Sequence, residues 1–186
     1  MDADQTRSRL LALLTERSFC KGKVILASGR ESDFYIDCKQ TSLSAEGHKL
    51  IGRLLYAQVR TRFDGVEAVG GPTLGADPLV SAVSTWSAIQ GDPLDAFIIR
   101  KGAKGHGTGQ PIEGLGNLRP SCPVALLEDV ITTAGSTMRS VDRCREAGLD
   151  VRGVLCLVDR QEGGRETIEA NDLELVSLFT RTDFPV

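Results

Sequence analysis

The chain has 186 residues, enough for one domain with its own hydrophobic core; 25% of them are charged, and the formal net charge is −3. This acidic balance argues against a general binder of nucleic acid or of membrane surfaces, because such binders carry an excess of positive charge. We therefore expect neither partner, and any site for an anionic ligand must be built from local groups.

Five cysteines are scattered along the chain, and no two of them have C-x-x-C spacing. An odd number without such spacing favours reduced thiols over a disulfide framework or a zinc site. No apolar run reaches the roughly 18 residues needed to cross a bilayer. The N-terminus MDADQTRSRL is polar and acidic, unlike the basic start of a signal peptide. We therefore expect a cytoplasmic protein.

The predicted elements begin with a leucine-rich helix over 4–17, for which Asp4 is the candidate N-cap. Two short β-rich runs within 24–38, separated by the turn signal SGRESD, predict a small ribbon. From Ser44 onward, amphipathic helices alternate with apolar strands. Helices are expected over 44–61, 75–89, 136–147 and 163–170, and strands over 66–70, 95–101, 124–128, 151–159 and 173–179. This alternation predicts an α/β fold with a central, mainly parallel sheet flanked by helices.

The stretch VALLEDVITTAGST at 124–137 carries the strongest functional signal. If VALL is a central strand, Glu128 and Asp129 emerge at its carboxyl end, where such sheets bind ligands. The following TTAGST leads into a helix N-terminus, whose unpaired N–H groups and dipole attract a phosphate. Paired carboxylates repel phosphate but accept hydrogen bonds from neighbouring hydroxyls. Together these groups predict a ribose-phosphate site, although an isolated Glu-Asp pair before a capped helix could also be merely solvated.

Two common nucleotide motifs are absent from the sequence: no G-x-x-x-x-G-K-[ST] occurs, and no G-x-G-x-x-G follows a strand. Residues 124–136 instead resemble the signature of the type I phosphoribosyltransferases, which bind 5-phosphoribosyl 1-diphosphate (PRPP). In that family the two acids hold the ribose 2′ and 3′ hydroxyls, and the loop cradles the 5′-phosphate. The resemblance implies that PRPP is bound by Glu128, Asp129, Val130, Ile131, Thr132, Thr133, Ala134, Gly135 and Ser136.

A basic, glycine-spaced stretch, RKGAKGHGTGQPIEG, occupies 100–114. Clustered cations on a flexible backbone suggest a lid that closes over a polyanion and stabilises developing negative charge. A solvated loop and an RNA-binding tract are the alternatives. The stretch resembles the pyrophosphate-binding loop of the orotate phosphoribosyltransferases, which acts largely across a dimer interface. The resemblance implies a homodimer with shared active sites, PRPP contacts from Arg100, Lys101, Lys104 and His106, and catalytic roles for Lys104, His106 and Asp129.

Two further segments are similar to the orotate enzymes. SGRESDFYIDCKQT at 28–41 matches their N-terminal hood, which implies one domain over 1–186 whose residues up to about 40 cover the base. LVDRQEGG at 157–164 matches the segment whose arginine pairs with orotate. This implies orotate contacts from Arg160 and Thr132. The alternative for Arg160 is a salt bridge with Asp159 or Glu162 at a helix start.

The stretch GGPTLGADP at 70–78 is expected to form a tight turn whose backbone amides hold pyrophosphate. A plain strand-to-helix turn is the alternative. Some family members carry a lysine where this chain has Leu74, and a lysine where it has Ala27. Glu128 stands where many members have aspartate. The first two departures put substrate affinity in doubt more than reaction type.

The resemblance therefore implies transfer of the phosphoribosyl group from PRPP to orotate, giving orotidine 5′-monophosphate and diphosphate in pyrimidine biosynthesis. Mg²⁺ is expected on the substrate diphosphate, without a dedicated protein metal site. One rival is a purine phosphoribosyltransferase, which should lack the hood and the RKGAKGHG string. The other is a non-catalytic PRPP-binding regulator of the same fold, which would usually lose the cationic lid and add a basic DNA-binding segment.

Overall fold

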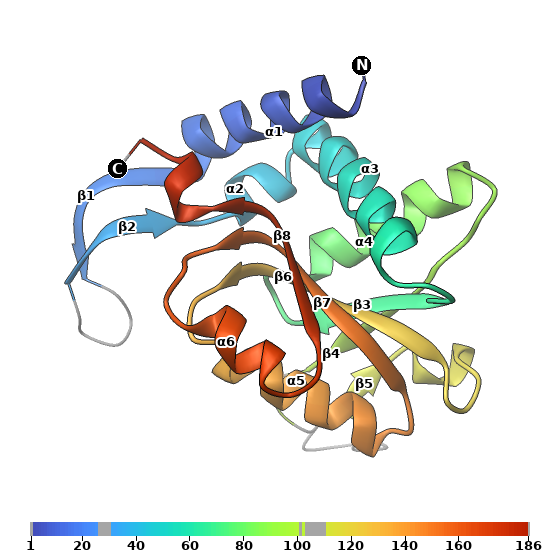
Figure 1. The fold of residues 1–186 in the computed structure, drawn as a ribbon. Coiled ribbons are helices and arrows are strands. Elements are labelled where there is room, and N and C mark those ends of the chain that lie inside the picture. The colour runs from blue at the N-terminus through green and yellow to red at the C-terminus, as the bar shows by residue number, and fades with distance from the viewer. Residues whose placement is uncertain (1, 26–30, 101, 103–110, 186) are drawn as a thin grey trace.

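The computed structural model describes residues 2–25, 31–100, 102 and 111–185, and a six-stranded sheet in the order β5-β4-β3-β6-β7-β8 forms its centre (Figure 1). The strands are β3 (Ala68–Pro72), β4 (Asp95–Ile99), β5 (Ile112–Glu113), β6 (Pro123–Ile131), β7 (Asp150–Asp159) and β8 (Glu174–Thr180). Neighbouring strands are parallel except for the antiparallel pair β4 and β5. The predicted α/β fold with a mainly parallel sheet is confirmed.

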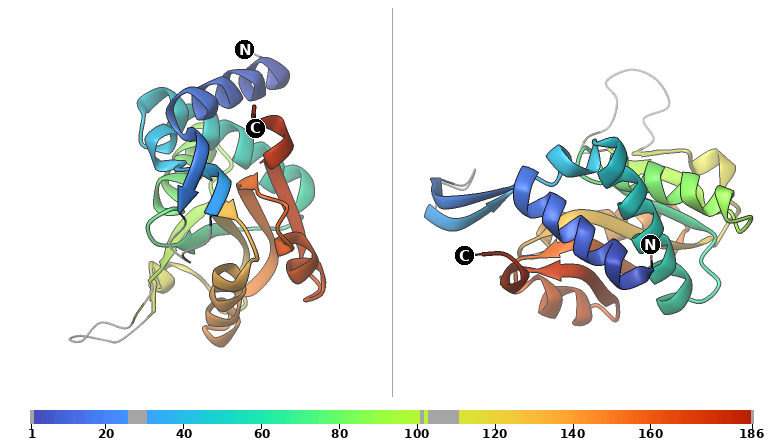
Figure 2. Two further views of the ribbon diagram at one scale, coloured as in Figure 1. Left: turned by 90° about the vertical axis from the view of Figure 1, so that its left-hand side faces the viewer. Right: turned by 90° about the horizontal axis from the view of Figure 1, so that it is seen from above.

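Helices cover both faces of the sheet (Figure 1). One face carries α1 (Ala3–Arg17), α2 (Lys39–Ser42), α3 (Ala45–Arg62) and α4 (Asp77–Ile89), and the other carries α5 (Gly135–Glu146) and α6 (Gly164–Glu169). Short 3₁₀ turns are η1 (Leu115–Asn117) and η2 (Arg181–Asp183). Figure 2 shows from above that α1 lies across the same face as α3. No helix among the described residues is long and apolar enough to cross a membrane.

The alternating side chains of β6 divide the interior into two cores. Ala125 and Leu127 join the core beneath α1, α3 and α4, whereas Val124 and Leu126 join the core beneath α5 and α6. Successive residues of a strand point to opposite faces, so a strand covered on both sides must be apolar at every position. This explains the uninterrupted apolar run that precedes the two acids.

The predicted ribbon is present as the antiparallel strands β1 (Phe19–Ile25) and β2 (Glu31–Ile36), which extend from one end of the molecule (Figures 1 and 2). Its root is held by aromatic packing: the Phe34 ring is fully buried and lies 5.4 Å from the Phe19 ring and 5.6 Å from the Phe184 ring. The C-terminal segment thus anchors the N-terminal ribbon. Of the predicted turn SGRESD at 28–33, the first three residues lie outside the described residues, and the last three belong to strand β2 instead of a turn.

Three local predictions differ from the structure. Asp2, not Asp4, caps α1: its side chain accepts the Gln5 N–H in a capping box, two residues earlier than expected. Strand β6 continues to Ile131, so both acids lie inside the strand rather than beyond it. Its β-branched last residues pair with Val158 and Asp159 of β7. Strand β5 was not expected, because two residues carry no periodic pattern.

Helices α3 and α4 approach closely at Gly52, where a Cβ would lie 2.5 Å from the Ala82 carbonyl oxygen. Gly52→Ala should lower the free energy of unfolding by about 1–3 kcal/mol, because the backbone of α4 must move to relieve the overlap. This loss should outweigh the gain of about 1 kcal/mol that alanine normally brings to a helix. Urea unfolding measures the difference. The matched control is Gly116→Ala, whose Cβ would meet nothing within 4 Å; unchanged stability in Gly52→Ala would contradict the close approach.

Candidate active site

A cleft of about 430 Å³ opens where β3 and β6 end. Its wall combines the end of β6, the turn between β3 and α4, the first turn of α5 and the start of α2. The lining residues are Lys39, Pro72, Thr73, Leu74, Gly75, Glu128, Asp129, Val130 and Ser136. The structure thus brings together the two predicted acids, part of the predicted phosphate loop and the predicted pyrophosphate turn. Its position matches the carboxyl-end location of ligand sites in parallel sheets.

The two acids of the cleft are held from opposite sides of the sheet. Glu128 is only 6% exposed, and its Oε1 accepts a hydrogen bond of 3.0 Å from the Thr137 hydroxyl on α5. Asp129 instead faces the turn before α4, and its Oδ1 accepts the Val130 N–H at 2.9 Å. Because the strand continues through both residues, they diverge as adjacent strand residues do. Both nevertheless line the same cleft.

The Asp129 carboxylate packs directly against Gly75. A Cβ on that glycine would lie 2.4 Å from Asp129 Oδ1, so no larger residue fits without displacing the carboxylate. Burial raises the pKa of Asp129, and the nearby Lys39 charge acts in the opposite direction. The Cys38 thiol donates a weak hydrogen bond of 3.8 Å to the Asp129 carbonyl. The segment at 38–39 and the turn before α4 therefore both contact or influence this carboxylate residue.

The predicted phosphate loop, 132–136, connects β6 to α5. Ala134 has a left-handed backbone with φ 62°, which turns the chain sharply into the helix. The first N–H groups of α5 have no partner within the helix and are available to an anion. The loop is accessible: Thr133, Gly135 and Ser136 are exposed. Thr137, the last residue of the TTAGST stretch, is buried, and its hydroxyl donates to Glu128, so it is not available to an anion.

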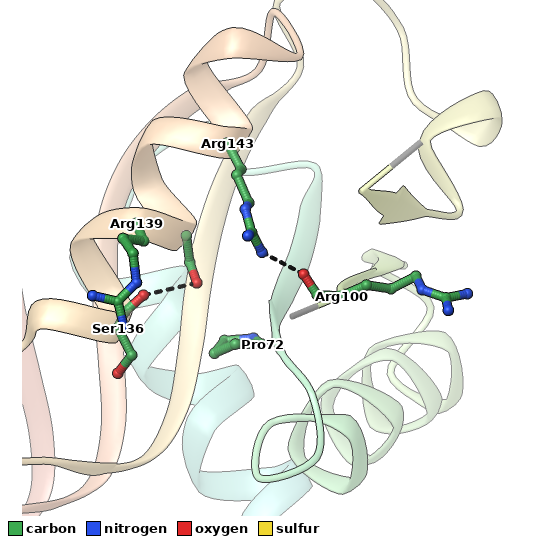
Figure 3. Close-up of a pocket in the computed structure, with 6 residues that line it drawn as sticks. Pro72, Arg100, Ser136, Arg139 and Arg143 are labelled. Carbon is green, nitrogen blue, oxygen red and sulfur yellow. Dashed lines mark hydrogen bonds between the residues drawn. The ribbon is translucent and has the colours of Figure 1, made fainter. Parts of the chain in front are cut away.

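A second cavity of about 360 Å³ adjoins the cleft and shares Pro72 and Ser136 with it (Figure 3). Its other lining residues are Arg100, Arg139, Ser140 and Arg143. Arg143 donates a hydrogen bond to the Arg100 carbonyl, which ties α5 to the end of β4. The Arg100 side chain points away from Arg139 and Arg143 (Figure 3), and it pairs with Glu113 at 2.9 Å.

The predicted lid lies mostly outside the described residues. Lys101, Lys104 and His106 are among the residues whose placement is not described, so the cationic cluster is not located relative to the cleft. Arg100 is described, and its ion pair with Glu113 of β5 was not anticipated. Sequence reasoning could not find this pair, because it depends on the short antiparallel strand β5.

Arg160 lies at the end of β7, directly after Asp159. It is only 6% exposed, its backbone N–H donates to the Ile131 carbonyl, and its guanidinium lies 5.5 Å from the Phe34 ring centroid. Arg160 also forms a salt bridge of 2.6 Å with Glu162. Arg160 is therefore positioned between the ribbon and the sheet, beside the end of β6 where Thr132 begins the loop.

Of the two salt-bridge partners considered for Arg160, Glu162 is the one observed, whereas Asp159 forms a salt bridge with Arg165 at 3.3 Å.

Lys39 is a cleft residue that the sequence analysis did not select. It lies within the quoted hood string, but no local pattern shows that a lysine after a ribbon strand reaches the end of another strand. Within the described ranges, no group of three or more His, Cys, Asp or Glu residues could hold a metal ion.

No protein-family model matches the sequence. The chain is 53% identical over 178 residues to the orotate phosphoribosyltransferase of Sorangium cellulosum, covering 96% of this chain and 92% of the relative. It is similar to the crystal structure of Mycobacterium tuberculosis H37Rv orotate phosphoribosyltransferase in complex with Fe(III) dicitrate: TM-score 0.84, 37% identity, 97% of this chain and 99% of the other covered.

A structure of the M. tuberculosis enzyme in complex with PRPP has a TM-score of 0.78 and 30% identity, covering 97% of this chain and 92% of the other. The similarity to the S. cellulosum relative extends over nearly the full length of both chains, so it includes the cleft, the phosphate loop and the ribbon. The chain belongs to the orotate phosphoribosyltransferase family.

Proposed function

We propose that the protein transfers the phosphoribosyl group of PRPP to orotate, giving orotidine 5′-monophosphate and diphosphate in pyrimidine biosynthesis. The observation that carries the proposal is the cleft in which Glu128 and Asp129, in the last residues of β6, lie just before the exposed loop and the N-terminus of α5. Carboxylates beside a helix N-terminus suit a ribose diol next to a phosphate. The PRPP complex of the M. tuberculosis relative supports the same substrate.

PRPP would be held at both ends of its sugar. The backbone amides of 132–136, with the Thr132, Thr133 and Ser136 hydroxyls, would receive the 5′-phosphate, while Glu128 and Asp129 accept hydrogen bonds from the ribose hydroxyls. Val130 and Ile131 contribute backbone geometry, since Ile131 is buried and its carbonyl accepts the Arg160 N–H. These contacts would hold C1′ of PRPP in the cleft, which lowers the entropic cost of bringing it together with the base.

In the reaction, the bond from C1′ to the diphosphate oxygen breaks and a bond from the orotate ring nitrogen to C1′ forms. Positive charge grows on the ribose ring and negative charge grows on the departing diphosphate. Lys101, Lys104 and His106, with Arg100, would stabilise the negative charge, while Asp129 and Glu128 hold the sugar. The attacking nitrogen belongs to orotate, so the mechanism needs no protein nucleophile.

Mg²⁺ is proposed as a substrate-bound ion. The cleft offers two carboxylates, and Mg²⁺ is commonly held by one or two carboxylates together with substrate phosphates. When bound, the ion would neutralise part of the diphosphate charge. The turn 72–75 and the loop cations would then bind the remaining charge of the substrate.

Orotate is proposed to bind between the ribbon and the end of β7. The Arg160 guanidinium is planar and can donate two parallel hydrogen bonds to a carboxylate, and its contact with Phe34 and its salt bridge to Glu162 restrict its orientation. Thr132 begins the loop on the neighbouring strand and would provide a hydroxyl to the base. The base and the sugar would then share one continuous site.

We also propose that the protein is a cytosolic homodimer with active sites shared between subunits. The resemblance of the 100–114 loop supports the shared site. All five cysteines are free thiols and four are buried, which supports a reducing compartment.

The direct test is to mix the purified protein with PRPP, Mg²⁺ and orotate and to follow the loss of orotate absorbance. Adenine, guanine and uracil are assayed in parallel under the same conditions. Turnover with orotate alone supports the proposal. Activity only with a purine would move the protein to the first rival class, and PRPP binding without turnover of any base would move it to the second.

Asp129→Asn and Lys104→Ala should each reduce turnover by well over about tenfold with the fold intact, because each removes a charge that acts on the reacting centre. The matched control is Asp142→Asn on the exposed face of α5, which should retain wild-type turnover. Circular dichroism checks the fold of all three variants. Wild-type turnover in both site variants would contradict the assigned roles.

Mixing the Asp129→Asn and Lys104→Ala variants should restore activity once their subunits exchange. In a hybrid dimer one of the two shared sites keeps both native residues, so a random mixture should recover up to about a quarter of wild-type activity. Sedimentation measures the oligomer in the same samples. A mixture no more active than its components would contradict sites shared in this way.

Arg160→Lys should raise the KM for orotate by at least about tenfold and leave the KM for PRPP within about twofold, because lysine cannot donate two parallel hydrogen bonds. The control is Arg152→Lys, at the other end of the same strand, where the side chain is exposed and pairs with Asp150. Steady-state kinetics with each substrate varied in turn separate the two effects. An equal rise in both KM values would show that Arg160 supports the whole site instead of contacting orotate.

A further inference from the structure

The described lining of the cleft has fewer positive charges than an anionic substrate such as PRPP requires. PRPP carries several negative charges, yet the cleft contains Glu128 and Asp129, and the turn at 70–78 has no lysine or arginine. Among the cleft-lining residues that the structure describes, Lys39 is the only cation. It comes from the start of α2, directly after the ribbon.

The ammonium group of Lys39 is positioned by Asp37. Lys39 Nζ lies 2.6 Å from Asp37 Oδ1, and the same oxygen accepts the Lys39 backbone N–H at 3.2 Å. The other carboxylate oxygen, Oδ2, accepts Gln40 Nε2 at 3.2 Å, so the Asp37 side chain is itself fixed. The Lys39 side chain remains 41% exposed. It is therefore oriented before substrate arrives and still accessible to it.

The side of the sheet on which Lys39 lies indicates which part of PRPP it can reach. Lys39 shares the cleft with Asp129 and the turn 72–75, and α2 and α4 lie on the face opposite α5 (Figure 1). The 5′-phosphate loop instead turns into α5, where Glu128 is bound to Thr137. A cation beside Asp129 and the turn is thus placed for the anhydride end of the substrate, away from the 5′ end.

We propose that Lys39 is a further substrate-binding residue that contacts the diphosphate group of PRPP and supplies the positive charge missing from the turn at 72–75. This inference rests on the proposed function. The group that Lys39 would bind is a diphosphate ester. The Lys39 charge also stabilises the ionised form of the Asp129 carboxylate. The short helix that follows the ribbon would then contribute to PRPP binding.

Two substitutions at Lys39 test the charge. Lys39→Met keeps an unbranched apolar stem without the charge, and Lys39→Arg keeps the charge. Lys39→Met should raise the KM for PRPP by at least about tenfold while kcat and the KM for orotate change by less than about threefold, and Lys39→Arg should recover most of the loss. Lys49→Met on α3 is the matched control, because Lys49 is exposed and lies outside this cleft.

Competitive inhibitors separate contact with the diphosphate from support of Asp129. Inorganic diphosphate and ribose 5-phosphate are each titrated against PRPP with the wild-type and Lys39→Met enzymes. The inference predicts that inhibition by diphosphate weakens by about the same factor as the KM for PRPP rises, while inhibition by ribose 5-phosphate is unchanged. Equal weakening of both inhibitors, or no change in either, would overturn it. Wild-type protein without orotate turnover would instead refute the proposed function.

Discussion

The position of the Asp129 carboxylate is the constraint on which the rest of the site depends. Strand β6 is apolar and buried on both faces through Leu127, and its two acids follow only beyond the residues that pair with β3, while β6 still pairs with β7. Taking a carboxylate partly out of water is unfavourable unless a cation or hydrogen-bond donor compensates. Here Lys39 and the Val130 N–H offset part of that cost, although burial still raises the pKa of Asp129, and Gly75 leaves the space for the carboxylate. A ribose would complete the hydrogen bonding that these neighbours begin.

The ribbon is packed into the rest of the domain through its aromatic residues. Phe34 packs against Phe19 and Phe184, so the first and last segments of the chain enclose the same ring. The guanidinium of Arg160, which follows the central strand β7, lies over the same Phe34 ring. The proposed base-binding arginine is thus oriented by residues distant in sequence. Rigid side chains of this kind keep a recognition group in its productive orientation before the ligand binds.

Much of this arrangement was predictable from sequence, for physical reasons. Ser44 was a sound helix start because its side chain accepts the Gly47 N–H, and apolar strands between amphipathic helices required a sheet covered on both faces. Interactions across the sheet were not predictable. The hydroxyl of Thr137 binds Glu128, and Lys39 reaches the cleft from α2. A local pattern states which residue types are present but not which distant backbone brings them together.

The two acids diverge, so different elements of the protein orient their carboxylates. Glu128 is oriented by the helix layer on one side through Thr137, whereas Asp129 is oriented by the turn and the short helix on the other side. A change in the packing of α5 would therefore disturb Glu128, one of the two proposed ribose-binding acids, more than Asp129. Substitutions in α5 and in the turn 72–75 should act on different acids, so the two proposed ribose contacts are separate targets for altering which sugar is accepted.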